Sequence, residues 1–275
     1  MAIMEEGVMS MSRSRSAAQQ RSSPNVPSVP VPGWIDLIGD PDGSSDGLVV
    51  TLAFEPRERG GQGEAGLPPS MAATAVQVAL VDGRGETIRR LSTAVHAVAA
   101  VVIDSGIRPP HADHDRETRR AECLDAARTL GKQSLRDVDA TLWRRWHDEL
   151  PTVLFRRATH VRGENDRALA MAAAIEREDW PSVGHLMMES QRSLLCNFEV
   201  CCPEVDALIA SAAGVDGVYG CRRAGGGFSG QVVAVVEACR AHAIVTEIIA
   251  AYRSATGRLP NWCVAAVASD HTVQA

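Results

Sequence analysis

Residues 217–236 read GVYGCRRAGGGFSGQVVAVV, and this stretch decides the fold. Two apolar runs, Gly217–Cys221 and Gln231–Val236, flank a connection that contains three consecutive glycines. β-Branched residues favour strands, whereas glycine clusters favour tight turns. The stretch therefore predicts two neighbouring strands that are joined by a glycine loop over Gly225–Gly230.

Outward from this hairpin, the spacing of apolar residues predicts helices. Leu154–Arg177 carries apolar residues at the spacing of one helical face. Asp179 is a typical N-cap for the next helix, with Pro181 in its first turn, and Pro203 begins a third helix that ends at Gly214. The other expected elements are strands over Trp34–Ile38, Leu48–Phe54, Ala97–Asp104 (buried) and Trp262–Ala268, and helices over Ser70–Leu80 (short), Glu117–Leu130 and Ala241–Ser254. Helices with an antiparallel sheet in this order predict an α+β sandwich.

Composition predicts a cytoplasmic protein that does not bind nucleic acid. The 275 residues are 45% hydrophobic and 23% charged, and their net charge of −6 comes without the basic stripe of a nucleic-acid binder. No apolar run is long enough to span a membrane, and no hydrophobic signal core begins the chain. Lys132 is the only lysine and lies outside any Walker P-loop pattern. The seven cysteines include no Cys-x-x-Cys pair, which predicts reduced thiols and no zinc site.

Two glycine-bearing segments are candidates for binding phosphate. Consecutive glycines at Gly225, Gly226 and Gly227 let backbone N–H groups converge and form an anion-binding nest, although a tight β-connection needs the same residues. Gly66 and Ser70 belong to a second turn that precedes an expected helix, and helix N-termini attract phosphate. Two prolines inside that turn remove N–H donors. From the residues alone, both segments can equally be ordinary loops.

Two polar clusters have residues that could act as ligands. His111–Asp115 has the composition of a metal-ligand set, but adjacent residues on a loop rarely converge on one ion. Asp40, Asp42 and Asp46 crowd one turn and could hold a divalent ion, although aspartate is also an ordinary turn residue. Neither cluster leads us to predict a metal site. No spacing links a Ser/His/Asp or Cys/His catalytic set.

Several motifs resemble, in their order along the chain, those of galactokinases in the GHMP small-molecule kinase family. The family patterns F-R-R-A-x-H-V, E-S-H-x-S-L, E-V-S-x-P-E-L-D and G-G-G-F-G-G are similar to Phe155–Val161, Glu189–Leu194, Glu199–Asp206 and Gly225–Gly230, and a strand and helix of the family resemble Val102–Gly106 and Arg119–Cys123. The resemblance implies a GHMP-kinase-like two-lobe α+β architecture. It comprises a disordered tail over residues 1–29, a shortened N-terminal lobe over 30–115, and a ferredoxin-like α/β sandwich over 116–275 as the C-terminal domain.

The segment Pro32–Ser44 is similar to the family's sugar-binding signature P-G-R-V-N-L-I-G-E-H-T-D-Y. Asp40 stands at the position of its sugar-binding glutamate, whereas Trp34, Pro41 and Gly43 replace an arginine, a histidine and an aspartate. The resemblance therefore implies Asp40 as a substrate-binding residue and the loss of several other sugar contacts. Because an unpaired buried polar partner costs roughly 1–3 kcal/mol, these losses weaken sugar binding.

The family's ATP loop G-L-S-S-S resembles Gly66–Ser70, in which two serines have become prolines. The resemblance implies that Gly66, Ser70 and the three glycines Gly225, Gly226 and Gly227 contact the nucleotide. The G-x-M-D-Q context of the family's catalytic aspartate has no counterpart in this chain, so no catalytic residue is assigned.

The function implied by the resemblance is phosphorylation of galactose to galactose 1-phosphate, with ATP and Mg²⁺ as cofactors and sugar and ATP as small-molecule partners. The missing residues imply two alternatives. One is a catalytically inactive galactokinase relative that acts as a ligand sensor or scaffold. The other is a truncated gene product.

Overall fold

A computed structural model describes residues 34–39, 47–56, 71–85, 87–91, 97–108, 111–200, 202–224 and 228–267. The strands are β1 (Trp34–Gly39), β2 (Leu48–Pro56), β3 (Met71–Asp82), β4 (Thr87–Leu91), β5 (Val98–Asp104), β6 (Val218–Arg223), β7 (Gln231–Glu237) and β8 (Asn261–Val267). The helices are α1 (Ala112–Thr129), α2 (Ala140–Glu149), α3 (Thr152–Glu176), α4 (Trp180–Ser193), α5 (Pro203–Ala213) and α6 (Ala241–Thr256). Short turns of helix, η1 (Leu135–Asp137), the π-helical η2 (Leu194–Phe198) and η4 (Ala238–Arg240), complete the described chain. The predicted tail over residues 1–29 lies outside the described residues.

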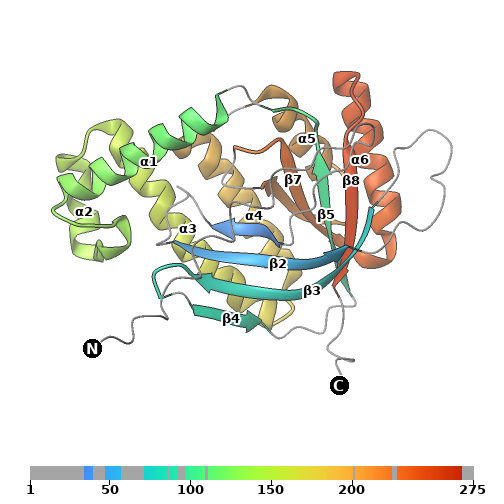
Figure 1. The fold of residues 1–275 in the computed structure, drawn as a ribbon, viewed down its shortest axis with the longest axis horizontal. Helices are drawn as coiled ribbons and strands as arrows, with labels where there is room; N and C mark the ends of the chain where they lie inside the picture. Colours follow the sequence, from blue (N-terminus) through green and yellow to red (C-terminus); the bar gives the residue numbers. More distant parts are fainter. Residues whose placement is uncertain are drawn as a thin grey trace, which may run out of the picture. The chain divides into compact units, whose positions relative to one another are not determined.

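All eight strands belong to one mixed sheet, in the order β1-β2-β3-β8-β5-β7-β6, with β4 paired to β3 (Figure 1). The pairs are antiparallel except for β3 and β8, which run parallel. The central position of β8, the last strand in the chain, joins the N-terminal strands to the rest of the sheet. The sheet thus crosses the expected boundary at residue 115, and the two-part division stays a prediction.

The prediction of a short helix over Ser70–Leu80 is wrong, because this segment forms a strand. Residues 71–82 form β3, which pairs with β2 on one side and with β4 and β8 on the other. Alanines give this segment good helix propensity, but its pairing with three strands overrides that propensity. Burial and strand pairing decide whether a short apolar segment becomes a helix or a strand.

Two apolar cores cover the two faces of the sheet. In β5, Val98, Ala100 and Val102 pack in a core with α3 and α4, whereas the intervening residues pack in a second core with α5 and α6. All seven residues of β5 are buried. The prediction of a buried strand over Ala97–Asp104 is therefore confirmed. A third core links α1, α3 and η2 with Phe228 beside the glycine loop.

The α3–α4 pair lies close to the sheet because two glycines allow it. A Cβ on Gly184 of α4 would lie 2.0 Å from the carbonyl oxygen of Tyr219, and a Cβ on Gly220 of β6 would lie 2.2 Å from the carbonyl oxygen of Gly184. Only glycine fits where two backbones approach this closely.

The remaining elements agree with the predicted ones within a few residues, with three differences. Helix α1 begins at Ala112, five residues before the expected start, so that His111–Asp115 forms its exposed N-terminal end rather than a loop. Strand β4 and helix α2 were not expected. The predicted N-cap of α4 is confirmed, since the Asp179 carboxylate accepts a hydrogen bond from the backbone N–H of Ser182.

Candidate functional site

The residues predicted to bind sugar or nucleotide lie outside the described residues; they are Asp40, Gly66, Ser70, Gly225, Gly226 and Gly227. Their roles stay predictions. The structure does describe the residues that hold the ends of two of these segments: the β1–β2 connection (residues 40–46), which contains Asp40, and the glycine loop.

Two neighbouring side chains of α3 hold both ends of the β1–β2 connection. The Glu164 carboxylate accepts a hydrogen bond from the backbone N–H of Gly39 at 3.1 Å, and the Asn165 amide oxygen accepts one from Leu48 at 3.0 Å. Gly39 has a φ of +97°, and a Cβ there would lie 2.1 Å from the Leu48 carbonyl oxygen. The connection therefore begins at a position that needs glycine and is fixed at each end by the long helix of the C-terminal half.

Glu164 is the centre of a buried polar cluster that joins three elements. Its carboxylate accepts hydrogen bonds from Ser190 of α4 at 2.9 Å and from Arg167 at 2.8 Å, and Arg222 of β6 lies 3.8 Å away. The side chain is fully buried. Burial alone would raise the pKa of Glu164, but the positive charges of Arg222 and Arg167 outweigh it and lower the pKa to about 2. The carboxylate is therefore ionised across the physiological range.

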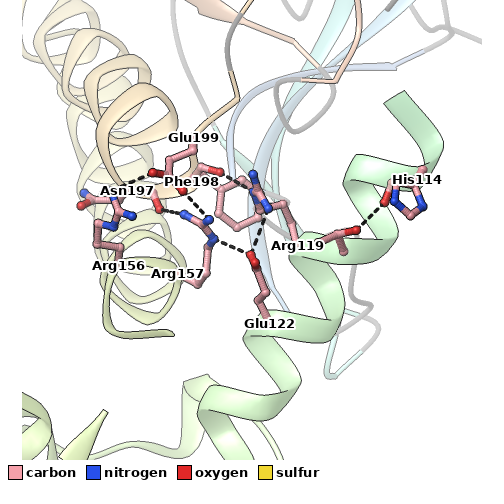
Figure 2. A network of polar contacts seen from close by, with 9 residues as sticks. His114, Arg119, Glu122, Arg156, Arg157, Asn197, Phe198 and Glu199 are labelled. Atoms are coloured by element: carbon pink, nitrogen blue, oxygen red, sulfur yellow. Dashed lines mark hydrogen bonds and ion pairs between the residues drawn. The ribbon is translucent and has the colours of Figure 1, made fainter. Parts of the chain in front are cut away.

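A second buried network joins α1, α3 and η2 (Figure 2). The Arg157 guanidinium donates to the carboxylates of Glu122 and Glu199, at 2.6 and 2.5 Å, and to the carbonyl oxygen of Asn197 at 2.5 Å. Arg119 donates to Glu122 and to the Phe198 carbonyl oxygen. Arg157 is 2% exposed. Charge-assisted hydrogen bonds of this kind fix the position of the helices.

The second network includes Glu199, a glutamate whose backbone has an unfavourable conformation. Glu199 has a φ of +57°, in the left-handed region that non-glycine residues rarely adopt. Its carboxylate is fixed by Arg157 and also by Arg156 at 2.7 Å. Those pairs lower the pKa of Glu199, with the Arg157 hydrogen bond as the largest cause. The segments similar to F-R-R-A-x-H-V and E-V-S-x-P-E-L-D therefore meet in space.

His160 stands between the two networks. Its Nδ1 atom lies 2.8 Å from the Ser193 hydroxyl, and its ring stacks on Phe198 with centroids 4.4 Å apart. The side chain is fully buried, and burial lowers the pKa of His160 to about 3. The imidazole is therefore neutral at physiological pH.

Hydrogen bonds join the described residues at the two ends of the glycine loop. The Ala224 N–H donates to Gln231 at 3.0 Å, and the Ser229 hydroxyl donates to the Ala224 carbonyl oxygen at 2.9 Å. The Gly230 carbonyl oxygen accepts bonds from the N–H and the hydroxyl of Ser105, which follows β5. Arg116 of α1 lies over the ring of Phe228 at 5.5 Å.

No role was predicted from the sequence for Glu164, Asn165 or Arg157. For the first two, the spacing of apolar residues in α3 could have indicated one. The apolar face of α3 includes Val161 and Ala168, and helical spacing places residues 164 and 165 between them on the same face. A carboxylate and an amide at core positions need buried partners, which the structure supplies from β1 and β2.

Comparison with known proteins assigns one part of the chain to a family. The family model described as "GHMP kinases C terminal" matches residues 171–254, which run from the last residues of α3 into the end of α6. This part of the chain is a GHMP kinase C-terminal domain. The predicted resemblance is therefore confirmed.

Curated relatives of this chain include galactokinases. Galactokinase of Bos taurus is 38% identical over 180 residues, which is 62% of this chain and 46% of the relative. Galactokinase of Homo sapiens is 43% identical over 144 residues, which is 52% of this chain and 37% of the relative. The chain thus spans less than half the length of these relatives.

A solved structure supports the fold. The crystal structure of Lactococcus lactis galactokinase complexed with galactose matches with a TM-score of 0.65 and 22% identity, covering 71% of this chain and 52% of that one. The likeness concerns the fold, and it confirms the predicted GHMP-kinase-like α+β class. Among the described residues, no helix is long and apolar enough to cross a membrane, and no group of three or more His, Cys, Asp or Glu side chains is placed to hold a metal ion.

Proposed function

We propose that this chain is a sugar kinase of galactokinase type, whose reaction is the ATP-dependent phosphorylation of galactose to galactose 1-phosphate. The observation that carries the proposal is the pair of contacts from Glu164 and Asn165 to the two ends of the β1–β2 connection. They attach the segment that resembles the sugar-binding signature to α3, the helix whose last residues begin the part matched as a GHMP kinase C-terminal domain.

In this proposal Asp40 accepts a hydrogen bond from a sugar hydroxyl. Backbone N–H groups of Gly225, Gly226 and Gly227 bind the nucleotide phosphates, together with Gly66 and Ser70. The hydrogen bonds of Ala224 with Gln231 and Ser229 support this role, because they hold together the two ends of the loop that contains the three glycines. ATP would supply the phosphoryl group, and Mg²⁺ would neutralise the charge of its oxygens.

The sequence favours one second candidate function, which is ligand binding without phosphoryl transfer. Trp34, Pro41 and Gly43 stand where galactokinases have polar sugar contacts, and no Met-Asp-Gln context supplies a base. A general base contributes typically 10²–10⁴-fold to a rate, so turnover without one should be slower by at least that factor. A protein of this kind would still bind galactose or ATP as a sensor.

One assay tests the proposal and separates the two candidates. The full chain is incubated with galactose, ATP and Mg²⁺, and galactose 1-phosphate is measured against a control without protein. We expect product above the control, and less product from Asp40→Asn than from Asp125→Asn, a matched change at an exposed acid of α1. No product would overturn the kinase proposal. If ATP or galactose nevertheless raised the melting temperature, the binding function would stand in its place.

A further inference from the structure

A polar groove lies along α3 and α4 on the side that α2 borders. Its volume is about 430 Å³, and its lining includes Trp143, Arg162, Asp166, Arg167, Glu189 and Arg192. Glu164, Asn165 and Arg157 are not among the described residues that line it, although Arg167 of the lining donates to Glu164.

Two of the three guanidinium groups in the groove have hydrogen-bonding capacity left among the described residues. Arg167 is committed to the buried Glu164 carboxylate. Arg162 stacks on Trp143 at 5.0 Å, its nearest carboxylate oxygen is 3.9 Å away on Asp166, and its buried Nη1 atom donates to no described acceptor. Arg192 is exposed and makes no hydrogen bond or ion pair with any described residue.

The chemistry of this lining fits an oxyanion. Guanidinium groups bind phosphate through paired N–H donors, and stacking on an aromatic ring holds the donor plane of Arg162 in place. The carboxylates of Asp166 and Glu189, 70% and 50% exposed, face the same groove. Carboxylates repel an anion but accept hydrogen bonds from one that carries a proton. Phosphate carries a hydroxyl at neutral pH, whereas sulfate carries none.

We propose that this groove binds inorganic phosphate, with Arg162 and Arg192 as donors and with Asp166 or Glu189 accepting from its hydroxyl. The site has two defining properties. Affinity depends on Arg192, and phosphate binds in preference to sulfate because only phosphate supplies a proton to the carboxylates.

The test uses the full chain and inorganic phosphate. The melting temperature is measured against phosphate concentration at constant ionic strength, with chloride as the balancing anion and sulfate as a parallel titration. A ligand that binds the native state raises the melting temperature in a saturable way. We expect saturable stabilisation by phosphate, a weaker effect of sulfate, and a loss of affinity of about tenfold or more in Arg192→Gln.

Two variants make the outcome specific. Arg253→Gln, at an exposed position of α6, removes the same charge elsewhere and should leave phosphate affinity unchanged. Glu189→Gln should raise the affinity for sulfate toward that for phosphate.

Stabilisation that does not saturate, or that Arg192→Gln and Arg253→Gln reduce equally, would show general charge screening and overturn the proposal. Equal affinity for phosphate and sulfate in the unchanged chain would remove the role of the carboxylates. Because the readout is the melting temperature in the presence of phosphate alone, this result does not depend on kinase activity.

Discussion

The helical region from α1 to α5 and the strands β1 to β4 are held by different kinds of contact. In the helical region, a buried arginine binds two carboxylates and a carbonyl oxygen, so that α1, α3 and η2 are fixed by charge-assisted bonds. Strands β1 to β4 join the sheet through the parallel β3–β8 pair and pack on α3, and the backbone N–H groups of Gly39 and Leu48 donate two buried hydrogen bonds to side chains of that helix. The motifs shared with the family thus build much of the helical scaffold, whereas the β1–β2 connection is fixed at its described ends by two side chains of α3.

The largest expected effect follows from breaking the buried arginine network. Arg157→Met removes three charge-assisted hydrogen bonds from a side chain that is 2% exposed, although Arg119 still donates to Glu122 and Arg156 still pairs with Glu199. We expect the loss of these three bonds to lower the free energy of unfolding by about 3–5 kcal/mol. The neighbouring Arg156 makes one ion pair with Glu199 and is 35% exposed, so Arg156→Met should cost at most about 1 kcal/mol. Urea unfolding of the two variants measures both. Similar losses in the pair would contradict the role given to Arg157.

A smaller loss is expected where α4 approaches β6. Gly184→Ala puts a Cβ against the backbone of Tyr219, so the helix must move, at a cost of about 1–3 kcal/mol. Gly214→Ala is the matched control. Its nearest neighbour is 3.6 Å away and its φ is −86°, so this change should be neutral or stabilising by up to about 1 kcal/mol. Thermal or urea unfolding tells the two apart, and an unaffected Gly184→Ala protein would show that the contact is not tight.

The buried imidazole makes stability depend on pH. The pKa of His160 is about 3 in the folded protein and about 6.5 when unfolded, so the unfolded chain takes up the proton first as pH falls. Stability from neutral His160 is complete above pH 6.5 and is lost toward pH 3, by about 2 kcal/mol between pH 6.5 and 4.5. Glu164, with a pKa lowered to about 2, contributes to the pH dependence only below about pH 4.5.

Unfolding free energies at several pH values test this. His160→Gln should flatten the profile between pH 6.5 and 4.5, whatever its overall stability. His185→Gln, at an exposed histidine of α4, should keep the slope of the unchanged protein. An unchanged slope in His160→Gln would assign the pH dependence to other groups.

The smallest expected effect concerns one end of the β1–β2 connection. Asn165→Ala leaves the backbone N–H of Leu48 without its buried acceptor, which should cost about 1–2 kcal/mol. Amide hydrogen exchange at Leu48 should become faster, while exchange in the β5–β7 pair changes only as far as global stability does. Unaltered exchange at Leu48 would show that the amide oxygen does not hold this end.

Much of the fold could be predicted because local signals agree with the tertiary structure. Asp179 caps α4, Pro203 begins α5, and the β-branched run of β5 is buried on both faces. The signals failed where pairing partners are distant in sequence. An alanine-rich segment became β3 because β8, almost 200 residues later, lies beside it.

The candidate site was predictable only in part. The resemblance placed Arg157 and Glu199 in segments that are similar to family motifs, but it could not show that these two side chains form an ion pair. Glu164 and Asn165 drew no attention, since a polar residue on a helix is usually exposed. Their role depends on the position of β1 and β2 against α3, which no local pattern encodes.

The central claim is that α3 holds the β1–β2 connection through Glu164, and amide hydrogen exchange at Gly39 tests it most directly. Exchange is measured in the unchanged chain and in Glu164→Gln, with the amide of Val233 in β7 as the reference for global stability. The account predicts that exchange at Gly39 speeds up at least about tenfold more than exchange at Val233, because a charge-assisted bond contributes about 1.5–3 kcal/mol. Equal acceleration at the two amides would contradict it, since Glu164 would then stabilise the fold without holding the connection.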